Sequence, residues 1–203
     1  MARKKNKKRK LEKNITFLVE GITEKYYLSS LLDEFKYKKR KTIISLDGGG
    51  YKDFLNKIHK NKDIYDVIIV ITDMDKASTI TGEMKNLLEL IKLLEKQNLN
   101  NNIFLTFKDI EEWMKKSLPS IKGSLIQYLG YSGSTKGKED IYKRLSDKGG
   151  SFKLAKNKFK EENLFYIKKD ESKGKIIKEN KSKIQSNLMY FDEYLEKLNF
   201  IEK

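Results

Sequence analysis

Val67-Ile-Ile-Val-Ile-Thr-Asp-Met-Asp75 is an apolar run that ends in two aspartates. Its five consecutive branched residues predict a strand that is buried on both faces, which is typical of a parallel sheet. The run Ile15-Thr-Phe-Leu-Val-Glu-Gly-Ile-Thr-Glu24 has the same form and also ends in acidic residues. Open α/β sheets build their sites beyond the carboxyl ends of their strands. We therefore expect Glu20, Asp73 and Asp75 to converge at one edge of a sheet.

Carboxylates gathered at a sheet edge repel one another and need a counter-charge, and a divalent cation is the simplest one. The chain has no cysteine and a single histidine, His59. This composition excludes cysteine nucleophiles and ordinary zinc sites, and it disfavours a serine–histidine hydrolase. The expected metal is therefore held by oxygen, which indicates Mg²⁺ or Mn²⁺.

The local sequence around each acid gives a reason for a site and an alternative. Residues i and i+2 of an extended strand end point the same way, so Asp73 and Asp75 can reach one ion; the alternative is a solvated turn. Gly21 lets the backbone turn tightly after Glu20, whereas an acid at a helix start is also favoured by the helix dipole. The triplet at residues 48–50 can bring backbone amides to a phosphate, or it is simply a flexible turn.

Hydrophobic periodicity predicts the other elements of an α/β unit. Amphipathic helices are expected after the first strand, where Thr23 can cap the helix, at residues 51–61, and through residues 84–94. The strands are expected at residues 14–19, 42–46, 66–72 and 103–107. Their alternation with helices implies a mostly parallel four-stranded sheet with right-handed crossovers and flanking helices.

The chain is expected to have three parts. Residues 1–13 form a basic tail, with seven of the first ten residues basic, and we expect it to be disordered. Residues 14–118 form the α/β domain, and residues 119–203 form a helical, basic elaboration that starts at Pro119. Within this elaboration, helices are expected at residues 120–129, 138–146, 152–160 and 184–198.

Lysine and arginine exceed aspartate and glutamate by fifteen among 203 residues. Such a charge favours a polyanionic partner, either nucleic acid or an acidic membrane surface. Tyr128, Tyr131 and Tyr142 lie among lysines, which suits single-stranded or looped RNA, although ordinary packing explains them equally well. No run approaches the length of a membrane span, and the start lacks the apolar region of a secretory signal, so we expect a cytoplasmic protein.

The spacing of Glu20, Glu24 and Asp73-Met-Asp75 resembles the Toprim domain of topoisomerases, bacterial primases and small nucleases. The mark of that domain is a glutamate after the first strand and a DxD after the third. Among Toprim proteins the chain resembles the RloB-like defence nucleases and their OLD-type and AriB-type relatives. The resemblance covers roughly residues 14–118, and more weakly residues 131–160; it includes the glycine-rich turn and Phe107-Lys-Asp-Ile-Glu-Glu-Trp113. RloB-like proteins have F-E-x-W there, preceded by Asn-Pro and followed by a histidine. In this chain Ile110 replaces the phenylalanine, and the Asn-Pro and the histidine are missing.

The resemblance implies a Toprim-like catalytic domain with Mg²⁺-dependent endonuclease activity. It makes Glu20 the acid/base or a metal ligand, Asp73 and Asp75 metal ligands, and Glu24 and Glu111 supporting acids or ligands of a second ion. It further implies antiviral defence of the abortive-infection type, with RNA, including tRNA, as the target and an ATPase partner encoded nearby. The residues themselves do not choose RNA over DNA, and the oligomeric state, a homodimer included, stays open.

Two other interpretations remain. Asp73-Met-Asp75 after an apolar strand also resembles the haloacid-dehalogenase-like phosphatases, but those have Thr or Ser where this chain has Ala77, and their nucleophile usually follows the first strand. The second is a non-catalytic nucleic-acid-binding subunit of a defence complex whose acids hold a structural ion. That protein would bind RNA, but metal would not trigger cleavage.

Overall fold

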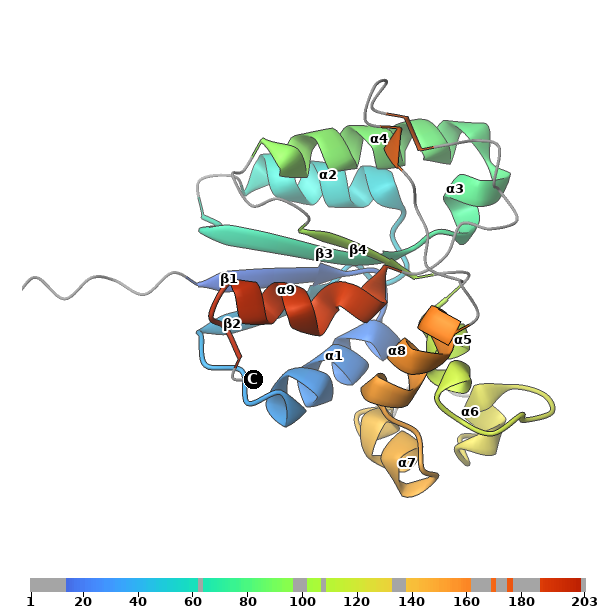
Figure 1. Ribbon diagram of the computed structural model, residues 1–203. Helices are drawn as coiled ribbons and strands as arrows, with labels where there is room; N and C mark the ends of the chain where they lie inside the picture. Colours follow the sequence, from blue (N-terminus) through green and yellow to red (C-terminus); the bar gives the residue numbers. More distant parts are fainter. Residues whose placement is uncertain are drawn as a thin grey trace, which may run out of the picture.

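The computed structural model describes residues 14–61, 64–96, 102–106, 109–132, 138–161, 169–170, 175–176 and 187–201. Four parallel strands form one sheet in the order β2-β1-β3-β4 (Figure 1). They are β1 (Ile15–Val19), β2 (Lys41–Ser45), β3 (Val67–Asp73) and β4 (Ile103–Thr106). The expected α/β fold, a mostly parallel four-stranded sheet flanked by helices, is confirmed.

Helices cover both faces of this sheet (Figure 1). On one face lie α2 (Tyr51–Lys60) and α4 (Thr81–Glu95), and on the other lie α1 (Ile22–Glu34) and α9 (Phe191–Lys197). Alternate strand residues enter the two cores. The core with α2 and α4 contains Leu18, Ile68, Val70 and Leu105. The core with α1 and α9 contains Phe17, Ile69, Ile71 and Phe104. The strands are continuous apolar runs because both of their faces are buried.

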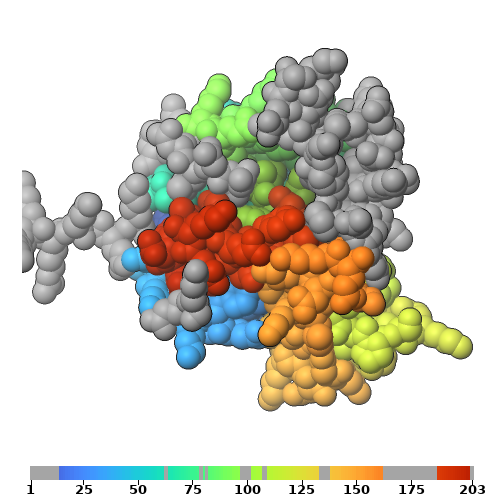
Figure 2. Space-filling model, viewed as in Figure 1, coloured from blue at the N-terminus to red at the C-terminus, as the bar shows by residue number. Residues whose placement is uncertain are grey.

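The end of the chain completes one covering layer of the sheet. A 3-10 helix, η2 (Leu188–Tyr190), leads directly into α9. Phe191 packs edge-on against Phe17 of β1 and Phe104 of β4, with ring centroids 6.3 Å and 5.0 Å apart. These contacts place the C-terminal helix on the α/β unit, and Figure 2 shows it beside α8 (Phe152–Glu161).

Asn187 closes the outer edge of β4. Its backbone amide donates to the carbonyl oxygen of Leu105 at 2.9 Å, and its side-chain amide donates to that of Ile103 at 3.1 Å. The amide of Leu105 in turn donates to the Asn187 side-chain oxygen. An open strand edge is a template for unwanted pairing, and one residue here bonds to the backbone groups of two strand residues.

Four further helices pack at the end of the sheet where the strands have their carboxyl ends (Figure 1). They are α5 (Ile110–Lys116), α6 (Leu125–Tyr128), α7 (Ile141–Asp147) and α8. Trp113 joins them to α1, because its indole nitrogen donates to the Tyr27 hydroxyl at 2.9 Å and its ring stacks on Phe159 at 4.8 Å. Trp113 is therefore a core residue.

One expectation for this half is corrected, and one open alternative is resolved for two tyrosines. The helix expected at residues 120–129 is only the short α6, because Gly123 just before it has a left-handed backbone with φ of +85°. The tyrosines Tyr131 and Tyr142 are buried and bonded to Asp140 and Glu34, so they are not free to stack on bases. Tyr128 is 38% exposed and remains a candidate.

Some sequence expectations lie outside the described residues. They concern the basic tail at residues 1–13, Phe107, and the start of the helix expected at residues 184–198. A short antiparallel ribbon of β5 (Lys169–Asp170) and β6 (Lys175–Ile176) was not expected. In the part of the chain that the structure describes, no helix has the length and apolar character of a membrane span.

Candidate functional site

Four acidic side chains meet where β1, β3 and β4 end. Glu20 follows β1, Glu24 lies in the first turn of α1, Asp73 ends β3, and Glu111 lies in the first turn of α5. Their charges act on one another: Glu24 and Glu20 both raise the pKa of Asp73, and Glu111 and Glu20 both raise the pKa of Glu24. The structure therefore brings together four of the five acids singled out in the sequence.

Glu20 crosses from β1 to the neighbouring strand. Its Oε2 accepts a hydrogen bond from the Thr72 hydroxyl at 2.9 Å and from the Asp73 backbone amide at 3.3 Å. Its Oε1 accepts from the Lys76 ammonium at 3.2 Å. Burial lowers the pKa of Lys76, but the charge and hydrogen bond of Glu20, together with the charges of Asp75 and Glu83, outweigh it, and the net direction is upward. Three donors thus fix Glu20 against the end of β3.

Asp73 is the most perturbed acid of this group. It is buried, and one of its oxygens accepts a hydrogen bond from the Thr106 hydroxyl on β4. Burial raises its pKa to about 9; the charge of Glu24 adds to the rise, and the Thr106 hydrogen bond opposes it. Tyr51 of α2 holds the backbone here, because its hydroxyl donates to the Asp73 carbonyl oxygen at 2.6 Å and accepts from the Ala77 amide at 3.4 Å.

Asp75 does not lie where strand geometry predicted it. Met74 has a helical backbone, with φ of −102° and ψ of −5°, and Asp75 begins the short helix α3 (Asp75–Thr79). Its side chain is exposed and accepts from the Lys76 amide at 2.6 Å. The expectation that Asp73 and Asp75 point the same way was wrong. It required an extended backbone as far as Asp75, whereas the strand ends at Asp73.

Glu24 folds back over the turn between β1 and α1. Gly21, not Thr23, is the residue before the helix, and its backbone is extended. A Cβ at Gly21 would lie 2.9 Å from Glu24 Oε2, so a side chain there would have to displace the Glu24 carboxylate, although the extended backbone itself is open to any residue. Burial raises the pKa of Glu24 to about 7, against hydrogen bonds from backbone amides that lower it.

A buried lysine from the second half of the chain completes the site. The Lys138 ammonium donates to the Thr23 hydroxyl at 3.2 Å and lies 3.9 Å from Glu111 Oε1. Burial raises the pKa of Glu111, and Asp109 adds to this, while Lys138 and Thr23 oppose it. No signal in the sequence distinguishes this lysine, because only the fold shows that it is buried beside an acid.

The glycine turn after β2 lies against the same site. The Gly48 amide donates to the Glu20 carbonyl oxygen at 2.8 Å, and the Gly49 amide donates to that of Leu46 at 3.0 Å. The Gly50 amide donates to the Asp53 carboxylate at 3.0 Å. Because all three amides are already bonded, the turn shapes the backbone behind Glu20 and does not cradle a phosphate.

The donor set fits a hard divalent cation. Its members are carboxylate oxygens, and burial together with neighbouring charge raises the pKa of Asp73 and Glu24, which a bound cation would reverse. Among the described residues, however, no three Asp, Glu or His side chains already lie in the arrangement of a metal site. The protein's own donors hold Glu20 and Asp73 instead, so metal ligation by Glu20, Asp73, Asp75 and Glu111 stays a prediction.

The raised pKa values predict how stability depends on pH. The pKa of Glu24 rises from 4.5 to about 7 on folding, and that of Asp73 from 3.8 to about 9. The folded protein therefore binds more protons than the unfolded chain between these limits, and the stability from these groups is lost as pH rises. We expect the melting temperature of the metal-free protein to fall between about pH 5 and pH 9, measured by differential scanning fluorimetry in EDTA. Added Mg²⁺ should raise the melting temperature more at pH 8 than at pH 5. A larger increase at pH 5 than at pH 8 would contradict the clustering of these acids.

Comparison with known proteins adds little to this geometry. No protein-family model matches the chain, and no curated protein matches it. Among solved structures, the chain is similar to the C-terminal region of the Burkholderia pseudomallei OLD protein, with 14% sequence identity and a TM-score of 0.35. The match covers 72% of this chain and 86% of that one. At that TM-score the similarity carries no conclusion about what this chain does.

Proposed function

We propose that this protein is a metal-dependent nuclease that hydrolyses phosphodiester bonds. The observation that carries this proposal is the group of Glu20, Glu24, Asp73 and Glu111 at the carboxyl edge of the sheet, with Asp73 and Glu24 buried. The carboxylate oxygens of such a group suit a divalent cation, and the net charge of +15 suits a polyanionic substrate. Phosphoryl transfer needs both, because the cation neutralises charge on the phosphate and polarises the attacking water.

The residues would divide the work as follows. Asp73 and Glu20 would hold Mg²⁺ or Mn²⁺, and Asp75, at the start of α3, would be a further ligand. Glu24, with a pKa of about 7 in the metal-free protein, can exchange a proton near neutral pH, as a general acid or base must. Lys138 supplies a positive charge beside Glu111, where it can stabilise negative charge that develops during the reaction.

The finer points of function rest on the Toprim resemblance in the sequence. It supports RNA, including tRNA, as the substrate, and a part in antiviral defence with an ATPase partner. A haloacid-dehalogenase-like phosphatase is less well supported, because its first aspartate must attack the substrate and Asp73 is buried under a Thr106 hydrogen bond. A non-catalytic nucleic-acid-binding subunit would keep the same charges without cleavage.

The proposal is tested by incubating the protein with total RNA and with plasmid DNA, with Mg²⁺, with Mn²⁺ and with EDTA, and then mapping the ends. We expect cleavage of RNA that requires the metal. Binding of RNA without metal-triggered cleavage would favour the non-catalytic subunit. Release of phosphate from a small phosphate monoester, without cleavage of either nucleic acid, would favour the phosphatase.

Glu111 and Glu112 provide a matched pair in the first turn of α5. Glu111 lies beside Lys138 and raises the pKa of Glu24, whereas Glu112 pairs with Lys115 at 2.5 Å. We expect Glu111→Ala to lower kcat/KM about 10- to 100-fold, as loss of a supporting group in a metal site does. Glu112→Ala should leave kcat/KM within about twofold, because both side chains experience nearly the same helix dipole but point about 100° apart. Equal effects of the two changes would reduce Glu111 to an acid at a helix start.

A further inference from the structure

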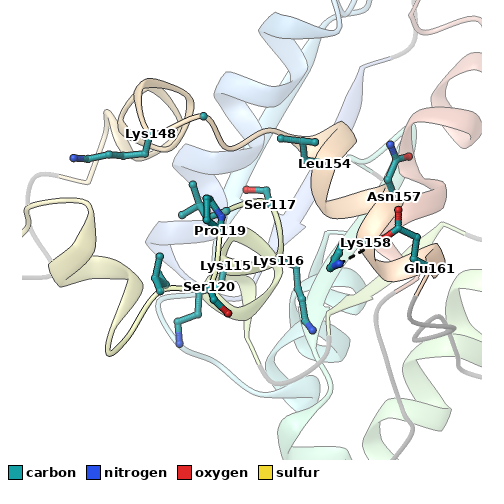
Figure 3. A pocket seen from close by; sticks show the side chains of 13 residues that line it. Lys115, Lys116, Ser117, Pro119, Ser120, Lys148, Leu154, Asn157, Lys158 and Glu161 are labelled. Atoms are coloured by element: carbon teal, nitrogen blue, oxygen red, sulfur yellow. Dashed lines mark hydrogen bonds and ion pairs between the residues drawn. The ribbon is translucent and has the colours of Figure 1, made fainter.

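A basic hollow at the other end of α5 has no part in the acidic site. It has a volume of about 790 Å³ and is lined by the end of α5, the segment that follows it, the turn between α7 and α8, and α8 itself (Figure 3). Among the residues that the structure describes, its lining contains four lysines, Lys115, Lys116, Lys148 and Lys158, and one acid, Glu161. Glu112 pairs with Lys115 at 2.5 Å and Glu161 with Lys158 at 3.5 Å. The described lining is therefore rich in lysine.

The lysines are arranged for an extended anion. Figure 3 shows Lys148 on one side of the hollow and Lys116 on another, with their ammonium groups pointing in different directions. Lys148 and Lys116 therefore do not converge on one point, as a site for a small anion would require. Ammonium groups spread along a rim suit a polymer that carries one charge per unit, such as a nucleic-acid backbone.

Apolar surface lies between these charges. Leu154 of α8 is 47% exposed, and Pro119 lies with it in the lining. The neighbouring Tyr128 is 38% exposed, and the Lys148 ammonium lies 5.6 Å over its ring. Unpaired bases have apolar faces that stack on such surfaces, whereas the bases of a duplex are stacked on one another and present only their edges.

The hollow lies close to the acidic site along one rigid helix. Glu111 in the first turn of α5 faces the acids, and Lys116 at its end lines the hollow. Five residues of helix span about 8 Å at a rise of about 1.5 Å each. A strand with one phosphate at the acids would therefore have its next nucleotides within reach of the hollow, at the same end of the sheet (Figure 1).

We propose that this hollow binds single-stranded nucleic acid next to the bond that is cleaved. The lysines at the rim contact backbone phosphates, and Tyr128, Leu154 and Pro119 contact unpaired bases. The inference rests on the proposed nuclease function for the identity of the polymer, and it adds that the substrate is unpaired at this position. It predicts that double-stranded substrates bind more weakly in the hollow than single strands of the same sequence.

Binding is measured with the full chain in EDTA, by fluorescence anisotropy of a labelled single-stranded oligonucleotide and of its duplex, over a range of salt. The test variant is Lys116→Gln/Lys148→Gln. The matched control is Lys52→Gln/Lys92→Gln, a pair that lines a smaller hollow between α2 and α4 in the opposite layer. The test pair should weaken single-strand binding about tenfold and reduce the salt slope by about 1.4, since each phosphate contact contributes about 0.7. The control pair should change the single-strand affinity by no more than about twofold and the salt slope by no more than about 0.3.

Tyr128→Leu separates base contacts from charge. It should weaken single-strand binding about fivefold and leave the salt slope unchanged, because it removes the stacking ring and no charge. If the test and control pairs lose the same amount of single-strand affinity, only the overall charge matters. If the test pair loses no affinity, the hollow does not bind the strand. Equal losses for duplex and single strand in Tyr128→Leu would refute the contact with bases. Cleavage with Mg²⁺ is assayed separately, so a protein that binds through the hollow but does not cleave contradicts only the nuclease proposal.

Discussion

Replacing Asp73 by asparagine is expected to abolish metal-dependent cleavage and, in the same protein, to raise the stability of the metal-free chain. Asparagine keeps the shape and can still accept the Thr106 hydrogen bond, but it carries no charge for a cation. Folding raises the pKa of Asp73 from 3.8 to about 9, so folding is opposed by this group at every pH above about 4. The variant should therefore have a higher melting temperature than the wild type, and the difference should grow from pH 5 to pH 9.

Asp66 supplies the control for Asp73, because it is an exposed aspartate just before the other end of β3, where it accepts a hydrogen bond from the Asn14 amide. Asp66→Asn should change neither cleavage nor the pH dependence of the melting temperature. Asp75→Asn should also lose cleavage, but without a gain in stability, since its side chain is exposed. Full cleavage by both the Asp73 and the Asp75 variants would remove these two residues from the site.

The strands and their parallel alignment could be predicted because the sequence shows both periodicity and burial. Ile68 and Ile69 are adjacent and both fully buried, one on each face of the sheet, as expected for a strand that is covered on both sides. The alternation of such strands with helices favours parallel pairing, which places the acids after the strands at one edge of the sheet. The spatial order β2-β1-β3-β4 was not predicted, and it is this order that places Asp73 opposite Thr106 and next to Glu20.

The details that the sequence did not predict depend on contacts between distant residues. Asp75 is exposed because the backbone becomes helical at Met74, and the Tyr51 hydroxyl, from a helix more than twenty residues earlier, holds that turn. Lys138 reaches Thr23 across a separation of 115 residues. Asn187 closes the edge of β4 from the last part of the chain. Hydrophobic periodicity describes only neighbours along the chain, so it cannot predict any of these contacts.

Glu20→Gln is the other change with a large expected effect. Glutamine keeps the shape of Glu20 and can still accept hydrogen bonds from Thr72 and the Asp73 amide, but it loses the ion pair with Lys76. We expect cleavage to fall about 10²- to 10⁴-fold, the range found when a general acid or base is lost. Single-strand binding in EDTA should persist, because a negative charge is removed beside a polyanion, and the melting temperature should change little. A parallel fall in binding and melting temperature would show that Glu20 is structural.

The metal dependence of this variant distinguishes the two roles that remain for Glu20. If Glu20 is a ligand, Glu20→Gln should need more Mg²⁺ for half-maximal cleavage, about 10- to 100-fold as for weakened metal sites, and a high concentration should restore much of the rate. If Glu20 transfers a proton, the Mg²⁺ requirement should stay the same, the maximal rate should stay low, and one limb of the pH–rate profile should disappear. Lys76→Gln sharpens the comparison, since it removes the cation that now pairs with Glu20. It should lower the Mg²⁺ requirement if the ammonium competes with the metal for that carboxylate, and leave it unchanged if Glu20 serves only as acid or base.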